Sequence, residues 1–121
     1  MRITIVGAGA LGSALGLALG PHCELSVLAR PGRRAEQLAA QGLSVFERGV
    51  RKRTPLRMAL SAAELPSPDV VVLAVKSYDT EAALDSLMPL MEKGQALVSL
   101  QNGLGNVERA VARFGESRVI Y

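Results

Sequence analysis

A run of closely spaced glycines near the N-terminus is the feature that most constrains how this chain can fold. Gly7 to Gly12 form the pattern G-x-G-x-x-G. The pattern directly follows an apolar segment, Ile3–Val6, that is typical of a strand, and it opens a helix predicted over Leu11–Leu19. A second strand is predicted at Glu24–Leu28, so this region has the pattern of one βαβ unit of about thirty residues.

Each of the three motif glycines meets a physical requirement of a turn that binds a dinucleotide. Gly7 permits the tight turn from strand to helix, and Gly9 lets a pyrophosphate approach the backbone without a Cβ atom in the way. Gly12 lets the helix pack closely on the strand, and free N–H groups at the start of the helix point at the phosphates. A glycine-rich turn that serves only helix packing is the alternative. The predicted pyrophosphate-binding residues are Gly7, Ala8, Gly9, Ala10, Leu11 and Gly12.

Beyond this unit the sequence predicts a second helix and then a region with a different pattern of residues. The helix is predicted over Arg33–Gln41, with Gly42 past its end. The segments Leu43–Glu47 and Val50–Leu60 then flank a short sequence, Arg48-Gly49, that suits a hairpin turn. We therefore expect an antiparallel ribbon between residues 43 and 60.

The second half of the chain returns to buried strands that alternate with helices. The strands are predicted at Val70–Val75 and Ala96–Leu100, and the helices at Thr80–Met91 and Asn106–Phe114. The last residues, 118–121, begin another strand. The fold class is therefore α/β, a Rossmann-type doubly wound, mostly parallel sheet with an antiparallel hairpin insertion. We expect residues 1–121 to be a dinucleotide-binding domain that is truncated within its last strand.

Composition limits the other functions that are open to the chain. Its 121 residues suit one domain, and 49% apolar against 21% charged residues is a globular balance. Aromatic residues make up only 3%, without any tryptophan, which argues against a base-stacking surface for nucleic acid. One cysteine and one histidine provide neither an internal disulfide nor a metal cluster, and they favour a reducing, cytoplasmic setting.

The stretch between Arg2 and Glu24 carries no charge, a property it shares with membrane spans and secretory signals. Glycines at positions 7, 9, 12, 16 and 20 interrupt the stretch in a pattern that a single continuous helix would not favour. We therefore expect neither a signal nor a membrane span.

The residue at the end of the second predicted strand indicates which cofactor the glycine turn serves. An NAD site has Asp or Glu at this point to bind the ribose hydroxyls. Here Arg30 lies about eighteen residues beyond Gly12, and no acid is present. A guanidinium suits a 2′-phosphate through charge-assisted, often bidentate hydrogen bonds, so we expect NADP(H) rather than NAD(H). The alternative is a solvated surface arginine, as Arg33 and Arg34 can equally be.

Basic residues gather in the segment that begins at Arg30. Between Arg30 and Arg57 there are eight basic and two acidic residues, a local net charge of +6 that leaves −3 for the remainder of the chain. This asymmetry can act as an electrostatic funnel for a phosphorylated cofactor. For the basic run at positions 51 to 53, the favoured interpretation is a set of exposed charges that deters pairing at a hairpin edge.

Two polar residues directly follow predicted strands, where ligands bind in open parallel sheets. Lys76 comes after Val70–Val75, and Asn102 comes after Ala96–Leu100. Both strand ends should face the same crevice as the glycine turn. Lys76 offers a cation for a ribose, a carboxylate or a carbonyl oxygen, and Asn102 offers a donor and an acceptor for nicotinamide or substrate. The alternatives are an exposed loop lysine and an asparagine in a left-handed turn before Gly103.

Together these motifs resemble the N-terminal domain of the ketopantoate reductase family, the 2-dehydropantoate 2-reductases. The resemblance covers the whole chain, and its most specific parts are Lys-Ser-Tyr at residues 76–78 and Gln-Asn-Gly-Leu-Gly at residues 101–105. It implies an NADPH-dependent oxidoreductase that converts ketopantoate to pantoate, on the route to pantothenate and coenzyme A. By the same resemblance, residues 7–12 hold the pyrophosphate, Arg30 the 2′-phosphate, Lys76 the nicotinamide end, and Asn102 the nicotinamide end or the substrate.

The chain departs from the family in one respect. Family members carry their general-acid lysine, and the Ser and Glu that help to hold substrate and cofactor, in a helical C-terminal domain that is absent here. Hydride transfer to a carbonyl requires a proton for the developing alkoxide, and no residue of this chain is an obvious donor. We therefore expect no catalytic residue in the chain, which should bind NADP(H) and reduce ketopantoate poorly or not at all.

Two other functions are compatible with these residues. One is a reductase with the same first domain that acts on another 2-oxo acid, and the other is a non-catalytic NADP-binding module. For a reductase, the expected partner is a small-molecule 2-oxo acid, and we expect no nucleic acid, membrane or metal to be involved. The sequence leaves a homo-oligomer open.

Overall fold

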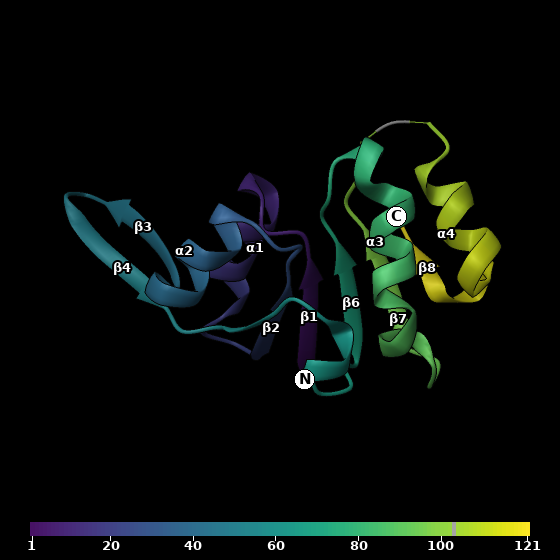
Figure 1. The fold of residues 1–121 in the computed structure, drawn as a ribbon, viewed down its shortest axis with the longest axis horizontal. Coiled ribbons are helices and arrows are strands. Elements are labelled where there is room, and N and C mark those ends of the chain that lie inside the picture. Colours follow the sequence, from purple (N-terminus) through teal and green to yellow (C-terminus); the bar gives the residue numbers. More distant parts are fainter. Residues whose placement is uncertain (103) are drawn as a thin grey trace.

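Short, largely buried strands form one parallel sheet at the centre of the molecule (Figure 1). The computed structural model describes residues 1–102 and 104–121, without the side chain of Val45. Within these residues the sheet has six strands: β1 (Arg2–Val6), β2 (Glu24–Leu28), β5 (Arg57–Ala59), β6 (Val70–Leu73), β7 (Ala96–Ser99) and β8 (Val119–Ile120). Their order is β5-β2-β1-β6-β7-β8, and every neighbouring pair is parallel. The order runs outward from β1 in both directions, which confirms the predicted doubly wound fold class.

Helices cover both faces of this sheet. The α-helices of the described residues are α1 (Ala10–Leu19), α2 (Arg33–Gln41), α3 (Thr80–Leu87) and α4 (Asn106–Phe114). Short 3₁₀ helices lie at Ala62–Glu64, Ser77–Asp79, Met88–Met91 and Glu116–Arg118. Because strand side chains alternate between the faces, each face has its own apolar core. Val71 of β6 packs with Leu84 of α3 on one face, and Val72 packs with Leu15 of α1 on the other.

The element boundaries agree closely with the sequence predictions. The strand Glu24–Leu28 and the helices Arg33–Gln41 and Asn106–Phe114 form with the predicted ends. The helix predicted over Thr80–Met91 ends as an α-helix at Leu87 and continues as a 3₁₀ helix that has Pro89 in its first turn. Proline lacks the N–H that an α-helical ladder needs at this point, which accounts for the change of helix type.

The predicted hairpin is present and stands apart from the main sheet. β3 (Leu43–Glu47) and β4 (Val50–Thr54) pair only with each other, in antiparallel register, and they project to one side of the molecule (Figure 1). Arg48 and Gly49 adopt positive φ values of 50° and 77°, as a tight two-residue hairpin turn requires. Leu43 is buried where it meets α1, and a Cβ atom at Gly16 would lie 2.5 Å from its Cδ1 atom. The glycine therefore lets the hairpin approach α1 closely.

Of the predicted segment Val50–Leu60, only Val50–Thr54 belongs to the hairpin, so the expectation was wrong for residues 55–60. The hairpin arm ends at Thr54, and β5 instead pairs in parallel with β2 at the edge of the main sheet. Pro55 cannot donate a ladder hydrogen bond, and it ends the arm. Met58 and Ala59 then pack against the cores on opposite faces of the sheet, which holds β5 in place.

The uncharged stretch between Arg2 and Glu24 is divided among several elements. It covers β1, the glycine turn, the ten-residue helix α1 and the connection to β2. Among the described residues, none of the helices is both long enough and apolar enough to cross a membrane.

Candidate functional site

The glycine turn lies where the strand order reverses, between the ends of β1 and β6. Ligands of open α/β sheets bind in the crevice beyond the strand ends at such a switch point. Gly7 continues the ladder by donating its N–H to the Leu28 carbonyl oxygen at 3.0 Å. Its φ is +108°, and a Cβ atom there would lie 2.8 Å from Val75 Cγ1. The turn therefore requires glycine at this position both for its backbone angle and for space.

The other two motif glycines differ in the space around them, which is open at one and closely packed at the other. Gly9 is the N-cap of α1 with an ordinary φ of −77°, and a Cβ atom there would have no atom within 4 Å. Open space therefore lies in front of the first helical turn, whose N–H groups have no partner within the helix. A Cβ atom at Gly12 would instead lie 2.1 Å from the Gly7 carbonyl oxygen. Gly12 thus brings the start of the helix against the end of β1.

A pocket of about 630 Å³ opens beside the glycine turn. It is bounded by the ends of β1, β2 and β6, the start of α2 and one face of α3. The structure brings five of the predicted site residues together in its lining: Gly7, Ala8, Gly9, Arg30 and Lys76. The predicted residues Ala10, Leu11, Gly12 and Asn102 are not part of the lining. The first three form the start of α1, directly behind Gly9.

The pocket carries a clear excess of positive charge. The basic side chains in its lining are Arg30, Arg33, Arg34 and Lys76. Among the described residues that line it, Asp79 is the single acid. A concave surface with this balance favours an anionic ligand.

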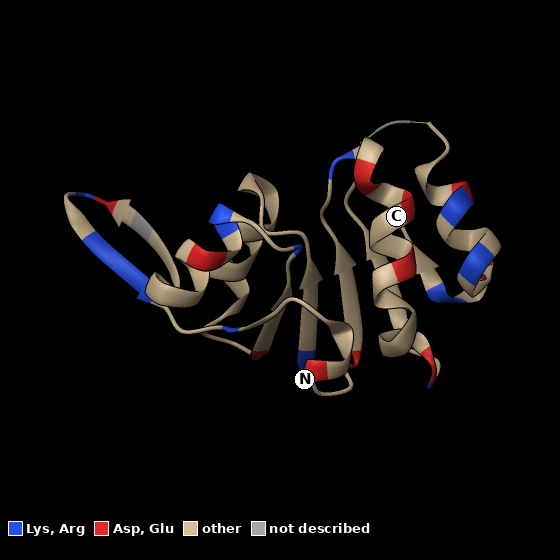
Figure 2. Cartoon of the chain, in the orientation of Figure 1, with Lys and Arg blue, Asp and Glu red and all other residues tan. Residues whose placement is uncertain are grey.

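The other basic residues of the 30–57 segment lie elsewhere. Figure 2 shows basic positions along β4 of the projecting hairpin. These hairpin residues are not part of the pocket lining. The Arg51 guanidinium lies 5.2 Å from the centroid of the Phe46 ring. Lys52 forms an ion pair with Glu47 and lowers the pKa of that carboxyl group below its usual value. The basic residues of the +6 segment are therefore divided among the pocket, the hairpin and, for Arg57, strand β5.

Arg34 is a pocket residue whose contacts the sequence did not reveal. From the start of α2 its Nε donates to the Ala8 carbonyl oxygen at 3.2 Å, and its Nη2 donates to Ser13 Oγ at 3.0 Å. Ala8 belongs to the glycine turn and Ser13 to the first turn of α1. Arg34 therefore connects α2 to the glycine turn and to the first turn of α1, at sequence separations of 26 and 21 residues.

Arg30 also has a partner that the sequence did not reveal. Its Nη1 lies 2.9 Å from Asp79 Oδ1, and the two residues are 49 positions apart in the chain. No local pattern links them, because the contact depends on β2 and β6 lying on the two sides of β1. The guanidinium that was predicted to bind a phosphate is thus paired with a carboxylate in this structure.

A network of hydrogen bonds joins the loops that follow β6 and β7. Ser77 Oγ donates to the Asn102 carbonyl oxygen at 2.8 Å, and the buried Asn106 side chain donates to the same oxygen at 3.1 Å. Gln101 Nε2 donates to the Val75 carbonyl oxygen at 3.0 Å and to Thr80 Oγ1 at 2.7 Å. The polar residues at 77, 101 and 102 therefore hold the two loops together.

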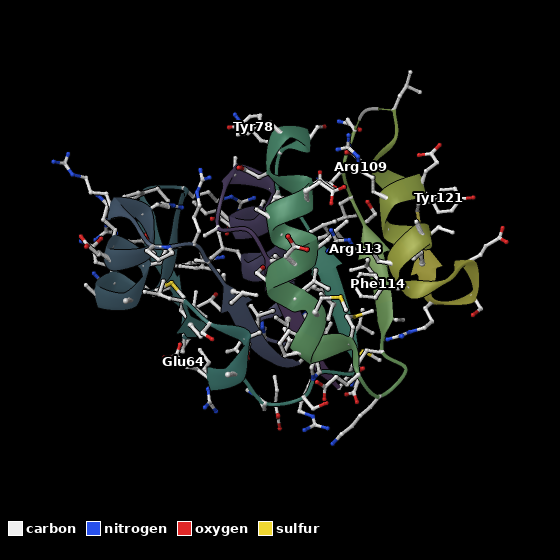
Figure 3. The ribbon with its side chains drawn as sticks, turned by 45° about the vertical axis from the view of Figure 1, so that its right-hand side comes forward. Glu64, Tyr78, Arg109, Arg113, Phe114 and Tyr121 are labelled. Carbon is white, nitrogen blue, oxygen red and sulfur yellow. The ribbon has the colours of Figure 1, made fainter. Side chains whose placement is uncertain are left out.

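Lys76 and Asn102 differ in their relation to the pocket. The exposed Lys76 lines it, whereas the Asn102 side chain is exposed beyond its lining. Tyr78, two residues after Lys76, also lines the pocket, and Figure 3 shows it at the top of α3 on the surface of the molecule. Gly103, part of the predicted Gln-Asn-Gly-Leu-Gly motif, lies outside the described residues.

The strand order, the glycine turn at its reversal and the adjoining basic pocket define a Rossmann-type α/β domain. A comparison with family models identifies which branch of this class is present. Residues 3–121 match the model for ketopantoate reductase PanE/ApbA, and the chain belongs to that family.

Curated relatives carry the same designation. The chain is 42% identical over 106 residues to the 2-dehydropantoate 2-reductase of Mesorhizobium japonicum, an alignment that covers 86% of this chain and 32% of the relative. It is 35% identical over 125 residues to the 2-dehydropantoate 2-reductase of Aquifex aeolicus, covering 99% of this chain and 37% of the relative. The chain therefore spans about a third of the length of these relatives.

Solved structures agree in fold and extend the range of related proteins. The 2-dehydropantoate 2-reductase of Geobacter metallireducens superimposes with a TM-score of 0.85 at 32% identity, over 98% of this chain and 40% of that one. A D-mandelate dehydrogenase in a ternary structure with NADH and anilino(oxo)acetate superimposes with a TM-score of 0.87 at 26% identity, over 98% of this chain and 39% of that one.

Proposed function

We propose that residues 1–121 are the NADP(H)-binding domain of a reductase that converts 2-dehydropantoate to pantoate. The observation that carries this proposal is the glycine turn at the switch point, with open space before Gly9 and a basic pocket beside it. Membership of the ketopantoate reductase family supports the substrate. We place the reaction in the cytoplasm, which the family and the free Cys23 thiol support.

The residues of the glycine turn and of the pocket each bind a different part of the cofactor. The N–H groups at the start of α1, from Ala10 onward, bind the pyrophosphate in the open space before Gly9. Arg30 binds the 2′-phosphate, and Lys76 and Asn102 serve the nicotinamide end, with Asn102 also available to the substrate. The reduced nicotinamide supplies the hydride for the carbonyl carbon of a 2-oxo acid.

The rest of the catalytic machinery is proposed to lie outside this chain. The alkoxide that forms on hydride transfer needs a proton donor, and the chain spans only about a third of its curated relatives. The direct test is to follow NADPH absorbance in the full-length protein with ketopantoate as substrate. Consumption of NADPH supports the proposal, and its absence with ketopantoate contradicts the substrate assignment.

A reductase of another 2-oxo acid is the second candidate. It is favoured by the similarity to the D-mandelate dehydrogenase, whose structure contains anilino(oxo)acetate and NADH. A panel of 2-oxo acids with aliphatic and aromatic side chains distinguishes the two candidates. A higher kcat/KM for an aromatic 2-oxo acid than for ketopantoate would favour the second.

Replacing Arg30 by alanine should weaken NADPH binding by about tenfold or more and leave NADH binding nearly unchanged. The reason is that a guanidinium forms charge-assisted hydrogen bonds with a 2′-phosphate, worth about 1.5–3 kcal/mol before screening by solvent. Isothermal titration calorimetry of the full-length protein with both cofactors measures the difference. Equal losses for NADPH and NADH would count against the 2′-phosphate assignment.

Replacing Arg34 by glutamine should weaken binding of NADH and NADPH to a similar degree, by about three- to tenfold. The reason is that two hydrogen bonds are lost, one to the glycine turn and one to the first turn of α1. Arg33→Gln is the matched control, since Arg33 is a neighbouring, exposed arginine in the same pocket lining. It removes the same charge and should have the smaller effect in the same titrations. If both variants lose equal affinity, charge alone matters and Arg34 does not shape the turn.

A further inference from the structure

An acidic side chain reaches the cofactor pocket from the far side of β1. Arg30 follows β2, whereas Asp79 lies in the turn that precedes α3, after β6. Since β2 and β6 flank β1, the ion pair between Arg30 and Asp79 joins the two sides of the pocket. The acid that is missing at the end of β2 is thus supplied next to Arg30 by a distant part of the chain.

The Asp79 carboxylate contacts Arg30, although its position before α3 would also allow it to cap that helix. Asp79 is the N-cap of α3, where an aspartate commonly accepts a hydrogen bond from the first helical turn. Within the described residues its side chain makes no such capping bond. The Asp79 side chain is 26% exposed and that of Arg30 is 76% exposed, so the guanidinium is the more solvent-accessible partner. Arg30 can therefore exchange this contact for one with a ligand in the pocket.

We propose that Asp79 sets the preference between the two nicotinamide cofactors, opposing NADPH and favouring NADH. This inference rests on the proposed function, because it requires the adenosine ribose of the cofactor to lie beside Arg30. A carboxylate accepts a hydrogen bond from a free 2′-hydroxyl, the role that an acid at the end of β2 has in NAD sites. A 2′-phosphate bound to Arg30 would instead lie close to a second negative charge.

In this proposal Arg30 adopts a different arrangement with each cofactor. With NADH bound, Arg30 stays with Asp79, whose remaining acceptor sites are open to the ribose hydroxyls. With NADPH bound, Arg30 leaves Asp79 for the phosphate, and Asp79 keeps its charge without that partner. Arg33, Arg34 and Lys76 line the same pocket and attract either cofactor through its pyrophosphate, so they do not distinguish the two. The choice between cofactors therefore depends on residues 30 and 79.

The test is calorimetric titration of the full-length protein and its Asp79→Asn variant with NADH and with NADPH. Asparagine keeps the size of the side chain and removes its charge. We expect NADPH to bind a few-fold more tightly and NADH a few-fold more weakly, so that the ratio Kd(NADH)/Kd(NADPH) rises about tenfold. Asp79→Ser places another good N-cap residue before α3 and also removes the charge. It should raise the ratio as well, and it keeps the test valid if the first variant does not fold.

Asp85→Asn is the matched control. Asp85 lies on α3, the helix that follows Asp79, and it does not line the pocket. It pairs with Arg113, which Figure 3 shows on α4. Its replacement removes the same charge and should leave the ratio unchanged. An unchanged or lowered ratio in Asp79→Asn, or an equal rise in Asp85→Asn, overturns the role of Asp79. Failure of the unmodified protein to bind either cofactor would instead contradict the proposed function.

Discussion

Replacing Gly9 by valine is expected to abolish binding of NADH and NADPH alike, with affinities lowered by about 100-fold or more. The position is open, because a Cβ atom there would have no neighbour within 4 Å, and its φ of −77° is one that valine can adopt. The new side chain would therefore occupy the space before α1 that we assign to the pyrophosphate. Valine is a poor N-cap residue, so a modest loss of stability of about 1 kcal/mol should accompany the change.

Two measurements separate blocked binding from damage to the fold. Thermal unfolding of the Gly9→Val variant should show a transition as cooperative as that of the unmodified protein. Gly9→Ala should give an intermediate loss of affinity, since a single methyl group fills less of the same space. Undiminished binding in the valine variant would show that the phosphates lie elsewhere.

Replacing Gly12 by alanine is expected to destabilise the fold by about 2 kcal/mol. Two effects oppose each other at this site. Alanine favours a helix by about 1 kcal/mol over glycine, but overpacking typically costs about 1–3 kcal/mol and sometimes more. The new Cβ atom would lie 2.1 Å from the Gly7 carbonyl oxygen, a backbone atom that cannot rotate away, so the steric cost should exceed the gain in helix propensity. Urea unfolding measures the difference.

Gly16→Ala provides the comparison within the same helix. The atom nearest to its Cβ position is Leu43 Cδ1, at 2.5 Å, which is the end of a flexible side chain. Leu43 can change its rotamer, so the stability should change by no more than about 1 kcal/mol. A Gly12→Ala variant as stable as Gly16→Ala would contradict the close packing of α1 on the end of β1.

Much of the fold could be predicted because strong local signals agreed with the tertiary arrangement. The apolar run of β6 and the glycine that ends α2 are local features, and they mark element boundaries well. The position of β5 could not be predicted in this way. It has three residues, and its pairing with β2 depends on a partner strand about thirty positions earlier and on burial of Ala59.

Some residues of the candidate site could likewise be predicted from the sequence, and others could not. Gly7, Gly9, Arg30 and Lys76 were found because each follows or opens an element at an expected distance, and the structure places them in one pocket. Arg34 and Asp79 were not singled out. An arginine at the start of a helix and an aspartate before one have ordinary local explanations, in solvation and capping. Their contacts with Ala8 and Arg30 arise only when separate βαβ units come together.

The hydrogen bonds that join the loops after β6 and β7 have a mechanical consequence. Bonds from Ser77 and Asn106 to the Asn102 carbonyl oxygen, and from Gln101 to the Val75 carbonyl oxygen, make this side of the pocket stiff. The opposite side is joined across the pocket by the solvent-exposed Arg30–Asp79 pair, which costs little to break. Any widening of the pocket should therefore occur by outward displacement of the loop after β2, while residues 75–77 and 101–102 move as a unit.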